Sequence, residues 1–398
     1  MPRPESLASA RLWLAFSIMV LVGGLTNAFP VFLPPLLAEF GGTRAAAAAG
    51  MSIFWLASAA LVPVTGGLVD RRDPRFVIGA GLALAACGTA GAALAPSLGA
   101  FSLVFGIGGG LGAGLTGFVS QAAVIAETYR ERRGFATGIA FSGSMAGFAL
   151  ASPAHWAITT IGWRWTLAAW ALALLALLPL VFRYYPRRLG ERPASAGTIE
   201  AGRVADVVRT VPFWALAIVF TAPPVAGYML TLHHSLYFTA RGFTATEAAT
   251  MLLVGGVLST AGRALAGFVA DRVGGPAAGL ASWGLSLTGA LCLIAFERAA
   301  VPALAYVYLL AVFLPMGSRA TIVSVLVTRI APPGRYGTVF GLLAIGNSLG
   351  AALGPFLSGK IYDLTGSYLA IFVTAAGVIV TATTALLVFL RTAPRPRE

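Results

Sequence analysis

Long apolar runs separated by short polar segments fill most of the chain. A helix needs about 20 apolar residues to cross a bilayer core roughly 30 Å thick. A window of that length finds twelve such runs, which predicts an all-α membrane protein. The first run is too long for the core of a secretory signal peptide, so we interpret it as a retained helix. The predicted spans are approximately 11–36, 46–69, 76–96, 99–127, 134–158, 163–183, 211–238, 246–270, 277–296, 301–328, 336–361 and 368–390.

The composition agrees with this prediction. Hydrophobic residues make up 58% of the chain, charged residues 10%, and the mean hydropathy is +0.85. A soluble domain carries about a quarter charged residues, so a soluble enzyme, a disordered protein and a coiled coil are all excluded. The two cysteines, Cys87 and Cys292, lie in apolar stretches, and we expect buried thiols. The sequence shows no metal-ligand spacing, nucleophile triad or phosphate-binding loop, so we expect no cofactor and no enzymatic activity.

Basic residues give the chain a formal net charge of +13. In a soluble protein this excess would suggest a nucleic-acid partner, but here the arginines sit in the short loops between spans. Twenty of the 27 Lys and Arg residues fall on one side of the predicted membrane and five on the other. The positive-inside rule then places both termini and the loop 184–210 in the cytoplasm. We therefore expect a multi-pass protein of the cell (inner) membrane and no nucleic-acid partner.

The loop 184–210 separates two predicted six-span bundles, 1–183 and 211–398, which resemble each other. Internal repeats of this kind are typical of secondary transporters, whose substrate site lies at the repeat interface near mid-membrane. The matched stretches are Gly67–Arg71 with Gly267–Arg272, Arg133–Gly138 with Tyr336–Gly341, and the glycines Gly143 and Gly147 with Gly346 and Gly350.

The first of these loops, with the pattern Gly-x-x-x-Asp-Arg, resembles the signature of the major facilitator superfamily, and the resemblance covers the whole chain. It implies twelve helices in two six-helix bundles that transport by alternating access. It also implies two cytoplasmic gates, one at Asp70 and Arg71 and one at Asp271 and Arg272. Asp70 would approach the start of span 11, and Asp271 the start of span 5. The alternative is that these loops only fix topology. One departure is visible, because Asp73-Pro74 replaces the small residue expected after the basic pair.

A narrower resemblance points to the branch of monocarboxylate transporters and oxalate/formate exchangers. It is carried by Ala28–Pro30, by residues 35–41, by Gly317–Arg319 and by the run from Gly337 to Tyr368. This resemblance implies that Arg263, in span 8, binds the carboxylate of the substrate.

The chain also departs from that branch at three positions. Ser259 stands where the proton-coupled carriers have an aspartate, and Val31 stands where they have a lysine. Asn347 is the polar residue within span 11, where the exchangers have a second cation. Proton symport, anion exchange and uniport therefore all remain open.

Arg263 also stands out without the family, because an ionisable group at mid-membrane is a functional candidate by default. It lies about eight residues, hence about 12 Å, from the cytoplasmic end of its span. A guanidinium can hold a carboxylate through two parallel hydrogen bonds. The alternative is a structural arginine paired to carbonyl groups. Arg319, about 15 Å into span 10, is either a second anion contact or a packing residue behind the cavity.

None of the acidic residues lies at mid-membrane, so the sequence supplies no carboxylate there to neutralise Arg263. The cavity is thus expected to be positive, which favours an anionic substrate and argues against a carrier of hydrophobic cations. All 14 acids fall in loops, tails or span ends: Glu5, Glu39, Asp70, Asp73, Glu127, Glu131, Glu191, Glu200, Asp206, Glu247, Asp271, Glu297, Asp363 and Glu398.

Histidine is the remaining group that could carry a proton near neutral pH. His233 and His234 lie toward the outer end of span 7, where they could take up a proton with the anion. The alternative is that one hydrogen-bonds a broken helix and the other faces the headgroups.

Further substrate contacts are expected from uncharged residues in the central spans. For each polar residue, a hydrogen bond between helices is an equal alternative to a substrate contact. For each aromatic residue, the alternative is simple packing against neighbouring helices. The candidates are Asn27, Gln121, Ser259 and Asn347 as polar contacts, and Phe29, Phe118, Phe141 and Met145 as apolar walls.

Taken together, these features predict a secondary active transporter, expected to be a monomer, that moves a small organic anion, above all a monocarboxylate. One alternative is a carrier of a drug or neutral solute in which Arg263 is structural. Another is a transport-silent membrane sensor.

Overall fold

A computed structural model describes residues 4–129, 133–187, 204–317, 319–332 and 335–394. These residues form helices, turns and loops, with no β-strand among them. Within the described ranges, nine stretches are long and apolar enough to cross a membrane. One of them, Phe135–Tyr184, contains two predicted spans, and the predicted spans 8 and 10 correspond to further helices outside the nine. Each of the twelve predicted spans therefore has a helical counterpart.

The chain divides into two compact units. The first consists of residues 1–192 and 232–260, and the second of residues 193–231 and 261–398. The last quarter of predicted span 7 and the first half of span 8 thus cluster with the N-terminal helices. The predicted domain boundary at the loop 184–210 stays a prediction, because 188–203 lie outside the described residues.

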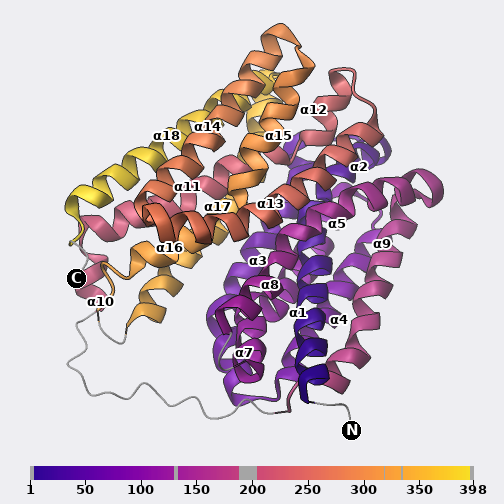
Figure 1. The fold of residues 1–398 in the computed structure, drawn as a ribbon. Helices are drawn as coiled ribbons and strands as arrows, with labels where there is room; N and C mark the ends of the chain where they lie inside the picture. The colour runs from indigo at the N-terminus through magenta and orange to yellow at the C-terminus, as the bar shows by residue number, and fades with distance from the viewer. Residues whose placement is uncertain (1–3, 130–132, 188–203, 318, 333–334, 395–398) are drawn as a thin grey trace. The chain divides into compact units, whose positions relative to one another are not determined.

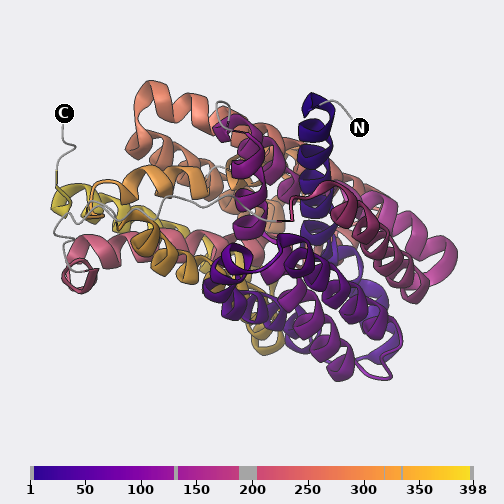
Figure 2. The same ribbon diagram turned by 90° about the horizontal axis from the view of Figure 1, so that it is seen from below.

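Several helices of the first unit are interrupted within a single predicted span, and the colours of Figure 1 follow them along the chain. Figure 2, seen from below, shows the indigo and purple helices of this unit running side by side. Its elements are α1 (Pro4–Asn27), η1 (Phe29–Val31), α2 (Leu33–Phe40), α3 (Arg44–Arg71), α4 (Pro74–Ala93), α5 (Leu98–Val104), the π-helical η2 (Phe105–Gly109), α6 (Gly110–Thr116), α7 (Phe118–Thr128), α8 (Arg133–Ala146), η3 (Gly147–Leu150), α9 (Ala151–Tyr184), α12 (His234–Ala240) and the start of α13 (Ala245–Val273).

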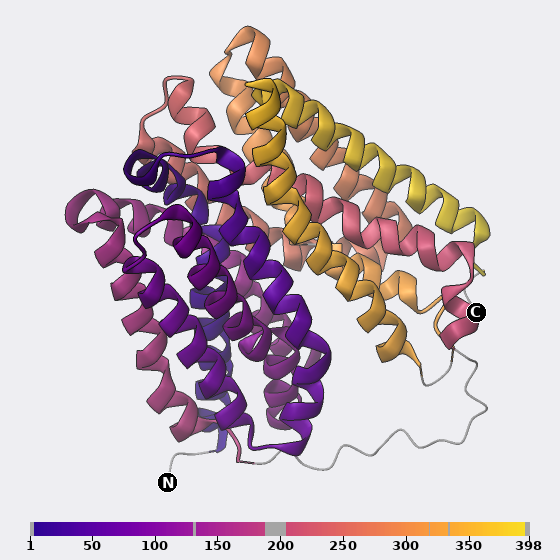
Figure 3. The ribbon, with the colours of Figure 1, turned by 180° about the vertical axis from the view of Figure 1, so that it is seen from behind.

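In the second unit α11 packs against both α17 and α18, as Figure 3 shows from behind. The unit takes in the C-terminal part of α13. Its other elements are α10 (Val204–Val208), α11 (Val211–Thr231), α14 (Gly275–Ala299), α15 (Pro302–Met316), α16 (Arg319–Val327), α17 (Tyr336–Thr365) and α18 (Tyr368–Thr392).

The glycines that match between the two halves occupy equivalent contacts, each within its own unit. Gly143 and Gly147 bring α8 and η3 against the backbone of α1, where a Cβ at either position would lie 2.5 Å from a backbone atom. Gly346 and Gly350 bring α17 against α11 at Thr221. Small residues let helices in a membrane approach this closely. The structure therefore supports the internal repeat inferred from the sequence.

Spans 5 and 6 are joined by a one-residue turn inside α9. Gly162 has φ +83° and ψ 159°, a conformation that L-residues other than glycine rarely adopt. The turn lies between predicted spans that end at 158 and begin at 163, in agreement with the sequence pattern.

The departure from the family loop pattern after span 2 has a structural reason. Asp73 is the N-cap of α4, and its side chain accepts a hydrogen bond from the backbone N–H of Arg75 at 3.0 Å. Pro74 follows at the first helical position, where its missing N–H costs nothing. The Arg75 guanidinium, 2.6 Å from the Asp73 carboxylate, holds the pKa of that carboxyl below its ordinary value.

One expectation about the cysteines is wrong. Cys292 is buried, but Cys87 is exposed on α4. In a chain of membrane-spanning helices an apolar neighbourhood along the sequence fits a surface that faces lipid as well as a core, so the sequence pattern did not distinguish them.

Candidate functional site: a membrane arginine beside a broken helix

Predicted span 10 is interrupted near its middle. Pro315 lies in the last turn of α15, Gly317 is the C-cap of that helix, and α16 begins at Arg319. The carbonyl groups at a helix end lack partners in their own helix and are available to side-chain donors. The Gly317 carbonyl accepts a hydrogen bond of 3.2 Å from Nε of Arg263. A broken helix of this kind is typical of transporter binding sites.

A close helix crossing places Arg263 at this break. The residue before it, Gly262, lies directly against the backbone of Leu314 on α15, and a Cβ at that position would overlap the Leu314 carbonyl. The backbones of α13 and α15 are therefore in contact one residue away from the arginine. Arg263 itself is half-buried. A guanidinium has five N–H donors, so the Nε bond fixes its plane while the group can serve more than one acceptor.

The second membrane arginine is held differently. Arg319 donates from Nη1 to the carbonyl of Pro223 at 2.6 Å and from Nη2 to Oγ of Ser286 at 3.2 Å. These bonds tie the start of α16 to α11 and α14. Gly227 leaves the necessary room on α11, because a Cβ there would lie 3.0 Å from Nη1. Of the two roles open for Arg319, the structural one is therefore favoured by these contacts.

Two of the predicted polar contacts are buried between helices of the first unit. Asn27 is 3% exposed and donates from Nδ2 to the carbonyl of Ser144 at 2.7 Å. Gln121 is fully buried, accepts from the Tyr185 hydroxyl at 2.7 Å, and donates to the carbonyl of Thr116 at 2.8 Å. That last bond bridges the interruption between α6 and α7. The interhelical alternative, and not a cavity lining, is what this geometry supports for both residues.

The four apolar candidates divide into buried and accessible ones. Phe29 is 1% exposed and packs against Phe101 and Phe105, so it belongs to the core of its unit. Phe118 is 44% exposed and meets the half-buried Phe141 edge to face, with ring centroids 4.8 Å apart. Met145 is also half-buried. The latter three can still line a cavity, whereas Phe29 cannot without rearrangement.

Two predicted polar contacts remain, one on α13 and one on α17. Ser259 lies on α13 one turn before Arg263 and is fully buried. Asn347 is half-buried on α17. Their roles as substrate contacts stay predictions.

The histidine pair lies at the interruption of span 7, between α11 and α12. His233 is 3% exposed and His234 is 1% exposed. Nε2 of His234 lies 3.1 Å from the carbonyl of Ala248, and its ring packs on Phe238 with centroids 4.6 Å apart. Both histidine side chains are therefore buried in this structure. Their role in proton coupling stays a prediction.

The residues predicted to form cytoplasmic gates are only partly described. Arg71 ends α3 and Arg272 lies in the last turn of α13, and both are exposed. The side chains of Asp70 and Asp271 lie outside the part of the chain whose side chains the structure describes. The gate contacts expected for these four residues stay predictions.

One polar cluster was missed by the sequence reasoning. Glu39 accepts from Nε1 of Trp163 at 2.6 Å and from Nη2 of Arg164 at 2.6 Å. Arg164 also donates from Nη1 to the carbonyl of Ala93 at 2.6 Å, and its guanidinium carbon lies 4.4 Å from the Trp163 ring centroid. We call Glu39, Trp163 and Arg164 the outer clamp, since it ties α2 and the end of α4 to the turn of α9. The only sequence signals were that Glu39 lies in the branch motif and that Arg164 is one of the five basic residues predicted to lie on the outer side.

The outer clamp predicts an acid-sensitive contribution to stability. Its hydrogen bonds from Arg164 and Trp163 hold the pKa of Glu39 below the ordinary value of 4.5. Because the folded-state pKa is lowered, the contribution is complete above pH 4.5 and is lost as the pH falls through the lower folded value. For an exposed pair we expect about 1 kcal/mol. In thermal melts, Glu39→Gln should lower Tm at pH 7 and differ less from wild type near pH 3. A constant difference, or an equal loss in the exposed-site control Asp206→Asn, would contradict this assignment.

Comparison with known proteins decides the family. The sequence profile of the Major Facilitator Superfamily matches residues 14–318 and 279–398. This chain belongs to the major facilitator superfamily. It is accordingly a multi-pass membrane transporter with the twelve-helix fold, as the sequence pattern predicted.

The relatives and solved structures agree with that assignment. Monocarboxylate transporter 13 of Bos taurus is 27% identical over 372 residues, covering 92% of this chain and 85% of the relative. An uncharacterized 38 kDa protein of Thermoproteus tenax is 30% identical over 92% of this chain and 91% of its own length. A bacterial homologue of the human lysosomal transporter Spinster has the same fold, with a TM-score of 0.74 at 18% identity, covering 100% of both chains.

Proposed function

We propose that this major facilitator transporter carries a small organic anion, in particular a monocarboxylate, by alternating access. The observation that carries the proposal is Arg263, a half-buried arginine in the middle of a membrane helix whose Nε is fixed on the carbonyl of a broken helix. The relatives named as monocarboxylate transporters support the same substrate class.

The chemistry of the site favours an anion. A positive charge within the bilayer is costly unless it is compensated, and a carboxylate neutralises and orients a guanidinium through paired hydrogen bonds. The Nε bond to Gly317 holds the plane of the guanidinium, so less side-chain freedom is lost when the anion binds. One cavity arginine suits a substrate with one carboxylate better than a substrate with two.

We propose that anion transport in this chain is not coupled to protons in the way it is in carriers that have an aspartate within the membrane. Ser259 cannot take up a proton at physiological pH, and both histidines are enclosed. We propose that exchange of one anion for another is the default mode, with proton symport through His233 or His234 as the competing mode. The basic loops support an orientation in the cell (inner) membrane with both termini in the cytoplasm.

Uptake by the full chain in proteoliposomes tests the proposal. Labelled lactate, pyruvate, formate and oxalate are offered separately, with and without an inward proton gradient. We expect saturable uptake of monocarboxylates, acceleration by unlabelled anion inside the vesicle, and a weaker response to oxalate. Absence of anion flux, with flux of a neutral sugar instead, would sink the proposal. Acceleration by the proton gradient, abolished in His234→Gln, would replace exchange by symport.

A further inference from the structure

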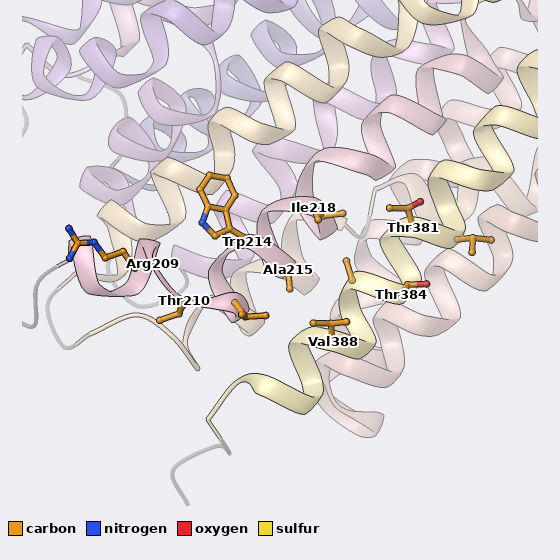
Figure 4. Close-up of a pocket in the computed structure, with 11 residues that line it drawn as sticks. Arg209, Thr210, Trp214, Ala215, Ile218, Thr381, Thr384 and Val388 are labelled. Atoms are coloured by element: carbon orange, nitrogen blue, oxygen red, sulfur yellow. The ribbon is translucent and has the colours of Figure 1, made fainter.

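A groove on the second unit lies apart from the arginine site. It encloses about 550 Å³ between the first turns of α11 and the C-terminal half of α18, and Figure 4 shows the side chains around it. The residues that line it are Arg209, Thr210, Val211, Trp214, Ala215, Ile218, Val380, Thr381, Thr384, Ala385 and Val388.

We propose that this groove binds one anionic phospholipid of the cytoplasmic leaflet, with an acyl chain along the groove and the headgroup phosphate at Arg209. The proposal concerns a different part of the chain from Arg263 and goes beyond the transport activity.

The walls of the groove are apolar. On α11 the lining residues Val211, Trp214 and Ile218 are exposed and recur at the spacing of one helix face. On α18 the facing stripe is Thr381, Thr384 and Val388, and the Thr381 hydroxyl donates to the carbonyl of Gly377 in its own helix. The Thr381 hydroxyl is therefore satisfied within its own helix. The methyl group of Thr381 can then contact an alkyl chain in the groove.

The depth of the groove matches one leaflet. From Arg209 to Ile218 the lining extends over ten residues, and the nine steps between them correspond to about 13 Å along a helix. Half of a bilayer core is about 15 Å thick. A single acyl chain fits this length, whereas a transmembrane helix from another protein would extend across both leaflets.

The charge of the rim selects the headgroup. Arg209 is exposed at the end of the groove that the positive-inside rule places in the cytoplasm. Arg391 lies one turn beyond Val388 on α18 and is also exposed. Basic pockets between membrane helices on this side bind anionic lipid headgroups. The lining contains no acid, and Asp206, the described acid nearest along the chain, is exposed on α10.

A tryptophan fits the level at which the headgroup would sit. Trp214 is 59% exposed, one helical turn into α11, and its ring meets the buried Phe213 edge to face with centroids 5.6 Å apart. Tryptophan side chains are enriched at the boundary between headgroups and hydrocarbon.

A second groove differs from the first in the charge of its lining. It holds about 470 Å³ between α3, α4 and α6, and its lining includes both Arg72 and Asp73. The carboxylate in that lining disfavours a phosphate. Arg72 therefore provides a matched control, since it is an exposed arginine at the rim of a groove without the proposed specificity.

Native mass spectrometry of the delipidated full chain tests the proposal, with phosphatidylglycerol and phosphatidylcholine of identical chains as probes. We expect wild type to bind one phosphatidylglycerol more tightly than phosphatidylcholine. Arg209→Gln should weaken only phosphatidylglycerol, by about fivefold, as expected for one arginine near a membrane surface. Thr384→Phe, which fills the groove, should weaken both lipids, and Arg72→Gln should change neither.

Three results would overturn the proposal. The first is equal binding of both lipids that Arg209→Gln does not change, and the second is binding unaffected by Thr384→Phe. The third is a dimer that Thr384→Phe dissociates, which would give the groove to a second copy of the chain. The three substituted side chains are exposed, so each variant is expected to fold, and thermal melts check this.

Discussion

Replacing Arg263 by glutamine is expected to lower kcat/KM for monocarboxylate uptake by about 100-fold. Removing one member of a buried, hydrogen-bonded charge pair costs 2–5 kcal/mol, and about 3 kcal/mol corresponds to that factor. Glutamine loses both the positive charge and the Nε donor that reaches Gly317. The loss should be measured as initial rates in proteoliposomes with equal amounts of folded protein.

Arg263→Lys separates charge from geometry. A lysine keeps the positive charge but has neither the planar fork nor the Nε donor, so we expect uptake between that of wild type and that of the glutamine variant. Arg298→Gln, at an exposed arginine near the end of α14, serves as the control and should transport normally. Uptake at the wild-type rate by a folded Arg263→Gln protein would make Arg263 a structural residue.

Arg319→Gln should behave differently. Its two terminal nitrogens hold Pro223 on α11 and Ser286 on α14, so the expected effect is on folding. Tm should fall, while the KM of the remaining folded protein should stay near wild type. A raised KM at unchanged Tm would instead make Arg319 a second anion contact.

The fold could be predicted from the sequence because the lipid bilayer restricts which structures a membrane-spanning chain can adopt. Every backbone polar group must be satisfied within the membrane, so each apolar run of sufficient length becomes a helix. Loop arginines and the paired glycines then indicated orientation and repeat. The helix contacts at Gly147 and at Gly350 show that the repeat reflects equivalent packing.

The sequence was less informative about where polar side chains point. In a soluble helix the polar face shows the solvent side, but a membrane helix can be apolar on all faces. The sequence made Gln121 a candidate for the cavity lining. In the structure its amide group is instead hydrogen-bonded to the Tyr185 hydroxyl and to the Thr116 carbonyl. Which face of a helix meets the cavity depends on contacts with helices far away in sequence, and a single sequence does not contain them.

The outer clamp and the break at Gly317 were unpredictable for related reasons. Glu39 and Arg164 lie 125 residues apart along the chain, so no local pattern joins them. Pro315 and Gly317 lie where span 10 is interrupted, but nothing in the sequence indicated that the carbonyl of Gly317 would meet Arg263. That contact depends on the crossing of α13 and α15, and therefore on Gly262.

Gly262→Ala is accordingly expected to damage both stability and transport. Alanine is the better helix former, by about 0.5–1 kcal/mol, so helix propensity alone would predict a gain. The new Cβ would overlap the Leu314 carbonyl, however, and overpacking a fitted contact costs about 1–3 kcal/mol. We expect a lower Tm and a reduced rate of anion uptake, because moving α13 away from α15 also moves Arg263 away from Gly317.

Gly284→Ala on α14 is the matched control, because a Cβ at that glycine meets no atom within 4 Å. It keeps the same change in propensity without the clash and should raise Tm slightly or leave it unchanged. If both alanine variants melt and transport alike, the α13–α15 crossing does not position Arg263. If Gly262→Ala alone loses uptake at a temperature where it remains folded, the positioning of the arginine by the helix crossing is what transport requires.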